Sequence, residues 1–66
     1  GRTSMELMRR LKVDGCIVDL FEVDKAGTST SSFIITTTVR IPRGLNREQY
    51  LESLMEIGGV LSVDSM

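Results

Sequence analysis

The stretch Phe33-Ile-Ile-Thr-Thr-Thr-Val-Arg-Ile41 has the clearest pattern in this 66-residue chain. It alternates with a strict period of two, which predicts a β-strand with one face in the core. The residues predicted to share the core face are Phe33, Ile35, Thr37, Val39 and Ile41. Pro42 lacks a backbone N–H and ends the strand, and Gly44 permits the following turn.

A second β-type run, Cys16–Asp24, precedes this strand. The small polar residues of Lys25–Ser32 separate the two runs and predict a hairpin loop. The facing of the first run is ambiguous, because its apolar side chains fall on both faces: Cys16, Val18 and Leu20 on one, Ile17, Phe21 and Val23 on the other. A β-bulge, or burial of both faces at the beginning of the strand, would explain why apolar side chains fall on both faces.

Two amphipathic helices flank the hairpin. The first is expected over Thr3–Asp14, with Thr3 and Glu6 as a capping box and Gly15 as its end. Its apolar stripe consists of Met5, Leu7, Met8 and Leu11. The second begins at the N-cap Asn46, with Gln49 in the capping-box position, and ends at Gly58–Gly59. Its apolar face consists of Tyr50, Leu51, Leu54, Met55 and Ile57, with Leu45 placed to pack on Tyr50.

A short last strand is expected over Val60–Asp64, with Leu61 and Val63 on one face. The order helix, strand, strand, helix, strand predicts an α+β domain of the ferredoxin-like or ACT-like class. In that class both helices cover one face of an antiparallel sheet, and this chain would be a βαββαβ unit lacking its first strand. We therefore expect residues 1–66 to be one domain and a piece of a longer chain, or one that borrows a neighbour's strand.

Composition excludes several classes of function. Eight Lys and Arg against nine Asp and Glu give a net charge of -1, without the cationic excess that nucleic-acid binding needs. With no His and one Cys, we expect no zinc site, no redox pair and no cofactor. A nucleophilic Ser would lack a base, so we expect no enzyme activity. No stretch approaches the roughly 18 apolar residues of a membrane span, so we expect a soluble chain.

Four stretches resemble the C-terminal cytoplasmic, ACT-like domain of the MgtC/SapB membrane-protein family: Leu7–Gly15, Phe21–Asp24, Val39–Glu48 and Gly58–Asp64. The resemblance implies a non-catalytic regulatory or assembly domain of a magnesium-associated membrane protein, at the cytoplasmic face of the membrane. It also implies that the domain meets the membrane only through the absent part of its parent chain. The missing strand and the thin core predict a homo-oligomer that pairs through sheet edges or helix faces. The family's membrane residues have no counterpart in this sequence.

The resemblance to ACT domains further implies a small-molecule effector site at Arg2, Thr3 and Ser4, with Gly1–Ser4 as the remains of the effector loop. Hydroxyl groups and unpaired backbone N–H groups would converge there with the Arg2 guanidinium. The alternative is that Thr3 is a plain helix cap. A further alternative for the whole chain is an amino-acid-binding ACT regulatory domain of a metabolic enzyme.

Other chemistry-bearing residues have ordinary explanations. The acidic residues Asp14, Asp19, Glu22 and Asp24 suggest a divalent cation, but Asp19 and Glu22 should point to opposite faces of a strand, so solvated charges are favoured. Cys16 is expected to be a small buried apolar residue. Three basic residues near one sheet end suit either anionic lipid headgroups or a solvated surface: Arg40, Arg43 and Arg47. An RNA-binding role ranks last, because only Phe21, Phe33 and Tyr50 are aromatic.

Overall fold

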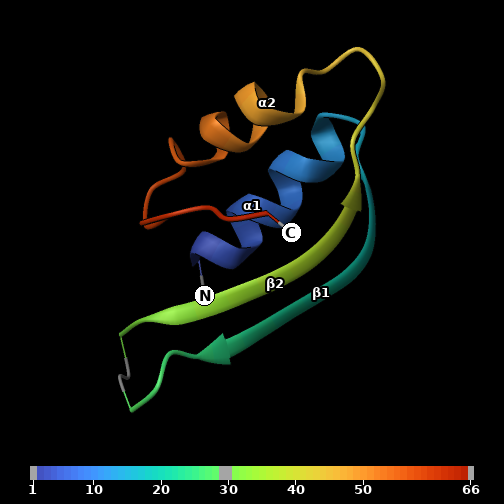
Figure 1. Ribbon diagram of the computed structural model, residues 1–66. Coiled ribbons are helices and arrows are strands. Elements are labelled where there is room, and N and C mark those ends of the chain that lie inside the picture. Colours follow the sequence, from blue (N-terminus) through green and yellow to red (C-terminus); the bar gives the residue numbers. More distant parts are fainter. Residues whose placement is uncertain (1, 29–30, 66) are drawn as a thin grey trace.

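The computed structural model describes residues 2–28 and 31–65 of the chain. Its elements, in chain order, are α1 (Arg2–Val13), β1 (Ile17–Lys25), β2 (Phe33–Arg40) and α2 (Arg47–Leu54). The two strands form an antiparallel sheet, and both helices lie on the same side of this curved hairpin (Figure 1). The result is a small α+β fold. Gly1, at the start of the predicted effector loop, and two residues of the hairpin loop lie outside the described residues.

The hairpin confirms both predicted strands to within one residue at each end. Ile17 lies opposite Arg40, and Lys25 lies opposite Phe33 at the other end. The register shifts between Val18 and Leu20, where β1 contains one extra residue, Asp19. This bulge resolves the ambiguous facing. Val18 and Phe21 both lie opposite odd-numbered residues of β2, and so they share the face that points to the helices.

The core joins both helices to this inner face of the sheet. Its buried members are Leu11, Cys16, Tyr50, Leu54 and Ile57. Half-buried residues of the inner face pack against them, including Val18, Phe21 and Val39. Leu11 is the most buried of all, with 1% of its surface exposed. Both helices contribute to this cluster, and Figure 1 shows both on this side of the hairpin.

A Schellman motif turns α1 directly into β1. The Cys16 N–H donates to the Leu11 carbonyl (2.9 Å), and the Gly15 N–H donates to the Lys12 carbonyl (3.1 Å). Gly15 has a φ of 85°, which glycine adopts without a steric penalty. The apolar contact that usually accompanies this motif is made by Leu11 and Cys16, which are both in the core. The predicted roles of Gly15 and of a buried Cys16 are therefore confirmed.

The predicted start of α2 is correct, but its predicted end is not. The Gln49 N–H donates to Asn46 Oδ1 at 3.0 Å, so Asn46 is the N-cap. The helix ends at Leu54 instead of continuing to Gly58–Gly59. From there the chain makes tighter turns, in which the Glu56 and Ile57 N–H groups donate to carbonyls three residues back. These turns rotate Ile57 into the core, although it lies beyond the helix.

Three details of the helix predictions are wrong. Thr3 does not cap α1, because the helix already includes Arg2, and the Thr3 hydroxyl is bonded elsewhere. Met5 is 74% exposed and lies outside the core. Met55 is likewise exposed, because the turns after Leu54 bury Ile57 instead. The stripe of α1 that contacts the core is thus narrower than its apolar sequence, and Leu7 and Leu11 carry it.

The predicted strand Val60–Asp64 does not form. The segment is irregular, although Val60 and Val63 pack against the core. Leu61, predicted to share a face with Val63, is 84% exposed. A strand exists only through a ladder with a neighbour, and among the described residues β2 pairs with β1 alone. The prediction failed because the pattern in the sequence does not supply that neighbour.

Replacing Gly15 tests the turn between α1 and β1. We expect Gly15→Ala to lower the free energy of unfolding by about 1–2 kcal/mol, since a Cβ strains a left-handed residue. Gly44→Ala is the matched control, because a Cβ there meets nothing within 4 Å and the φ is not left-handed. Urea unfolding measures both variants. Equal stabilities for the two would contradict this account of the turn.

Candidate functional site

The turn that follows α2 is hydrogen-bonded to the start of α1. The Thr3 hydroxyl donates to the Gly58 carbonyl at 3.1 Å. Gly59 has a φ of 96°, and a Cβ on it would overlap the Thr3 hydroxyl. Of the three residues predicted to bind an effector, Thr3 is thus engaged within the chain, Ser4 is half-buried and Arg2 is exposed. Their role as an effector site stays a prediction.

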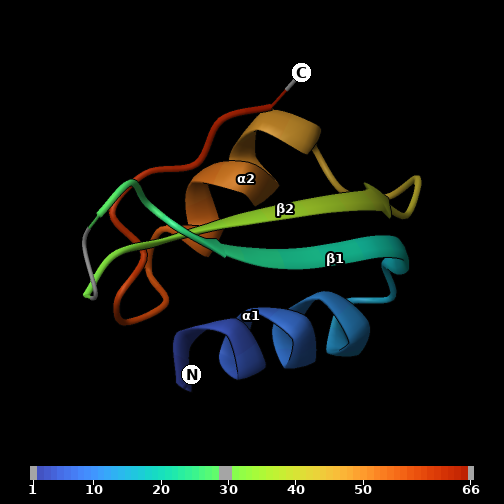
Figure 2. The same cartoon turned by 90° about the horizontal axis from the view of Figure 1, so that it is seen from below.

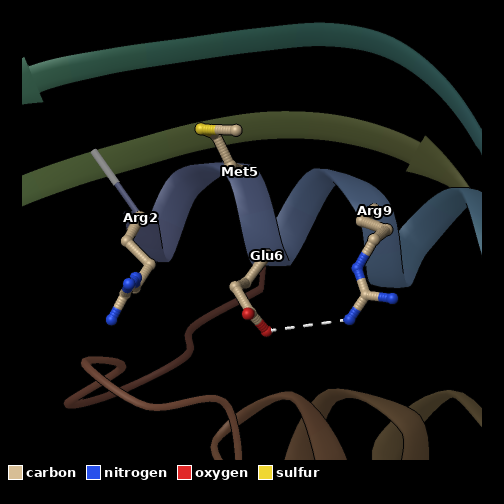
Figure 3. A pocket seen from close by; sticks show the side chains of 4 residues that line it. All are labelled: Arg2, Met5, Glu6 and Arg9. Carbon is tan, nitrogen blue, oxygen red and sulfur yellow. Dashed lines mark ion pairs between the residues drawn. The ribbon is translucent and has the colours of Figure 1, made fainter.

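A shallow hollow of about 590 Å³ follows the outer surface of α1. Arg2, Met5, Glu6 and Arg9 line it, and Figure 3 shows Arg2, Glu6 and Arg9 projecting to one flank while Met5 points to the other. Glu6 and Arg9 form an exposed ion pair at 4.0 Å, an arrangement worth little in water. All four lining residues are exposed, so the hollow is an open stretch of helix surface.

A polar link joins the end of α1 to α2. Asp14 Oδ2 accepts hydrogen bonds from Arg10 Nε and from the Tyr50 hydroxyl, each at 2.8 Å. Arg10 Nη2 donates to Ser53 Oγ at 3.3 Å. The Ser53 hydroxyl in turn donates to the Tyr50 carbonyl at 2.6 Å. We call Arg10, Asp14, Tyr50 and Ser53 the helix link.

The helix link shifts the ionisation of both its acidic groups. The hydrogen bond from Tyr50 and then that from Arg10 hold the pKa of Asp14 below its usual value. Burial of the phenol raises the pKa of Tyr50 well above its usual value, and the neighbouring Cys16 and Asp14 raise it further. At neutral pH the pair is therefore a carboxylate and a neutral phenol. It fixes the helices and holds no proton poised for transfer near pH 7.

The remaining charged candidates are separated from one another. Asp19, the bulge residue, accepts two hydrogen bonds from Arg40 at 3.2 Å on the outer face of the sheet. Asp14 is hydrogen-bonded to Arg10 and Tyr50 within the helix link. In the described part of the chain no three acidic or Cys residues come together in a way that would hold a metal ion. Arg43 and Arg47 lie apart from the Arg40 pair, beside the groove described next.

A groove of about 1550 Å³ runs beside β2 on the inner side of the sheet. We call the edge of β2 that faces away from β1 its open edge. Both views place the segment 60–65 on that side of β2 (Figures 1 and 2). Apolar residues of both helices and of β2 line the groove, among them Leu7, Leu11, Ile35, Val39, Leu51 and Leu54. Its size exceeds the usual range of small-molecule pockets.

Sequence reasoning missed the helix link and the groove. Asp14 and Tyr50 are 36 residues apart, and nothing in their local patterns pairs them. The groove depends on the failure of Val60–Asp64 to pair with β2, which only the structure shows. The strand compositions did indicate which strand has the open edge, because β1 carries charges along its length and β2 carries a single charge at its end.

No protein-family model, curated protein or solved structure matches this chain. Neither α1 nor α2 has the length and apolar character required to cross a bilayer, and this holds for all helices among residues 2–28 and 31–65.

Stability measured against pH tests the helix link. Asp14 ionises more readily when folded, so its contribution is present above about pH 4 and is lost as pH falls through the lower folded pKa. The raised pKa of Tyr50 gives a contribution that is present below about pH 10 and is lost as pH rises further. We expect the urea midpoint to fall on both sides of this range.

Two variants separate the acid fall from the alkaline fall in the dependence of the urea midpoint on pH. Tyr50→Phe should remove the alkaline fall and weaken the acid fall, since it deletes the hydroxyl but keeps the buried ring. Asp14→Asn should remove the acid fall that Asp14 causes. If Tyr50→Phe gives the same profile as the unmodified chain, the helix link does not contribute to stability.

Proposed function

We propose that this chain is a non-catalytic assembly or regulatory domain in which copies associate through the open edge of β2. In this proposal the fold is ferredoxin-like or ACT-like, with β2 as an interior strand and both helices on one face. Its parent is a membrane protein of the MgtC/SapB type, which the resemblance of Leu7–Gly15 and Val39–Glu48 supports. That origin would place the domain at the cytoplasmic face of a membrane.

The observation that carries the proposal is the contrast between the two edges of the hairpin. β1 has the features of a true outer strand: a bulge and four charged residues, Asp19, Glu22, Asp24 and Lys25. Such features keep an edge from pairing. β2 has no charge from Phe33 to Val39 and is rich in β-branched residues, as interior strands are. Its composition favours a partner strand on the open edge.

Exposed apolar side chains support association. Phe33 and Ile34 lie exposed at the loop end of β2, and Leu61 lies exposed in the segment after α2. Apolar side chains gathered beside an unpaired edge are typical of interaction surfaces. Because a 66-residue domain buries a smaller fraction of its surface than a larger domain does, the partner would also add stability.

The predicted effector site fits this proposal as a regulatory input. Thr3 holds the turn at Gly58–Gly59, from which the segment 60–65 departs. A small molecule bound at Arg2, Thr3 and Ser4 would compete for the Thr3 hydroxyl and would change how that segment lies. Binding at one site would then bias assembly at another, as linkage requires.

Sedimentation equilibrium tests the proposal. From about 10 µM to about 1 mM, we expect the average mass to rise from 7.3 kDa towards twice that value. In the same samples, amide exchange should slow at the open edge of β2 and stay unchanged at the outer edge of β1, which serves as the internal control. A mass of 7.3 kDa at every concentration would rule out self-association.

A further inference from the structure

We infer that the two helices form a second surface of self-association, on which α1 of one copy packs against α2 of another copy. The contact uses the outward surface of each helix, by which we mean the side that faces away from the sheet. It is separate from the open edge of β2, and so it goes beyond the proposed function. The charges on the two helices, the apolar side chains beside them and the symmetry of the pair carry the inference.

The outward surface of α1 is cationic and partly apolar. Its exposed charged residues are Arg2, Glu6, Arg9 and Lys12. Arg9 lies two residues from both Leu7 and Leu11, which contact the core, and it therefore lies on the opposite side of the helix. Met5 and Val13 lie one turn before and one turn after Arg9, and they are 74% and 73% exposed. The solvated side of a helix usually carries polar residues, so these two side chains favour a covered surface.

The outward surface of α2 has the opposite charge. Glu48 and Glu52 each lie two residues before a buried residue of the helix, and so they point away from the core. Glu56 continues their spacing of four residues into the turn after α2, and all three are exposed. None of them forms an ion pair in the described part of the chain. Met55, which is 46% exposed, adds an apolar side chain beside this acidic row.

The stability of α2 does not explain the acidic row. Like charges four residues apart destabilise a helix. Glu52 lies in the last turn of α2 and Glu56 just after it, where the helix dipole disfavours negative charge, and the last turn has no basic residue. A cationic surface placed over the row would remove both costs. The outward surface of α1 in a second copy has the required charge.

The arrangement of the helices allows this contact to form twice in one closed dimer. α1 and α2 lie side by side, because the helix link joins them near one end of α1 and the hydrogen bond from Thr3 to Gly58 joins them at the other (Figure 1). A two-fold axis that runs between two such helix pairs, along the boundary between the helices, places α1 of each copy over α2 of the other.

The two charged rows also match in length. Arg2 and Arg9 are seven residues apart, which is about 10 Å along α1. Glu48 and Glu56 are eight residues apart, which is about 12 Å along the direction of α2. Long side chains of opposite charge can therefore meet at more than one point along each contact.

Charge reversal tests the interface with the single variants Arg9→Glu and Glu52→Arg and with the double variant. Both residues are exposed, so the changes leave the core intact. At low ionic strength, we expect each single variant to weaken association at least about tenfold, because like charges then face each other in both contacts. The double variant restores opposite charges and keeps the net charge of -1, so it should associate like the unmodified chain. Sedimentation equilibrium measures all three.

Glu22→Arg is the matched control for Glu52→Arg. It makes the same change of charge at an exposed residue of β1, and its position opposite Thr36 places it on the face of the sheet that points away from the helices. We expect it to leave association unchanged. A loss as large as that of Glu52→Arg would show that net charge alone controls association, and would overturn the inference.

The remaining outcomes separate this interface from the open edge of β2. Association that is equally strong in the single and double variants would overturn the inference, and slowed amide exchange at the open edge would then leave the proposed function standing. Rescue by the double variant without slowed exchange there would support the helix interface and contradict association through the edge. A chain that stays monomeric at about 1 mM would overturn both.

An anionic membrane is the other surface that the cationic side of α1 could meet. In that case the chain would bind vesicles of phosphatidylserine and phosphatidylcholine, Arg9→Glu would weaken this binding, and the double variant would not restore it. Vesicle binding with this pattern, together with no effect of Glu52→Arg on self-association, would overturn the inference.

Discussion

The buried cluster that Leu11 shares with Tyr50 and Leu54 is the constraint on which the rest of the structure depends. It brings residues of α1 and α2 together over the inner face of the hairpin, and Leu11 is the most buried of the described residues. Burying a leucine stabilises a fold by about 1.5–3 kcal/mol, which is a large share for a domain of this size. The helix link, the Schellman turn at Gly15 and the position of Cys16 all lie within a few residues of this contact. Each of them fixes the direction in which a helix leaves the core.

This arrangement explains why the two edges of the hairpin differ. With both helices on the inner face, Figure 2 shows α1 alongside β1 and α2 alongside β2, and the groove runs beside β2. β1, with its bulge and its charged residues, has the features of an outer strand. The side with the uncharged strand has an apolar groove and an irregular segment instead of a third strand. The proposed association uses the side with the uncharged strand.

Local rules predicted the parts of the fold that depend on short-range chemistry. The hairpin follows from alternation in Phe33–Ile41, the α2 start from Asn46, and the end of α1 from Gly15, because each is set by residues within one or two turns. Thr3 was misassigned because its hydroxyl bonds a carbonyl 55 residues away. Val60–Asp64 has the composition of a strand, yet a strand requires a partner that local sequence does not specify. The helix link and the groove were out of reach for the same reason, and the Arg2, Thr3 and Ser4 site remains a prediction.

The most direct test of the account is a NOESY spectrum of the folded chain. If α1 and α2 share the inner face, the ring protons of Tyr50 will show NOEs both to the Leu11 methyl groups and to the Val39 methyl groups. NOEs that connect either helix to the outer-face residues Ile17, Leu20 or Ile34 would contradict it.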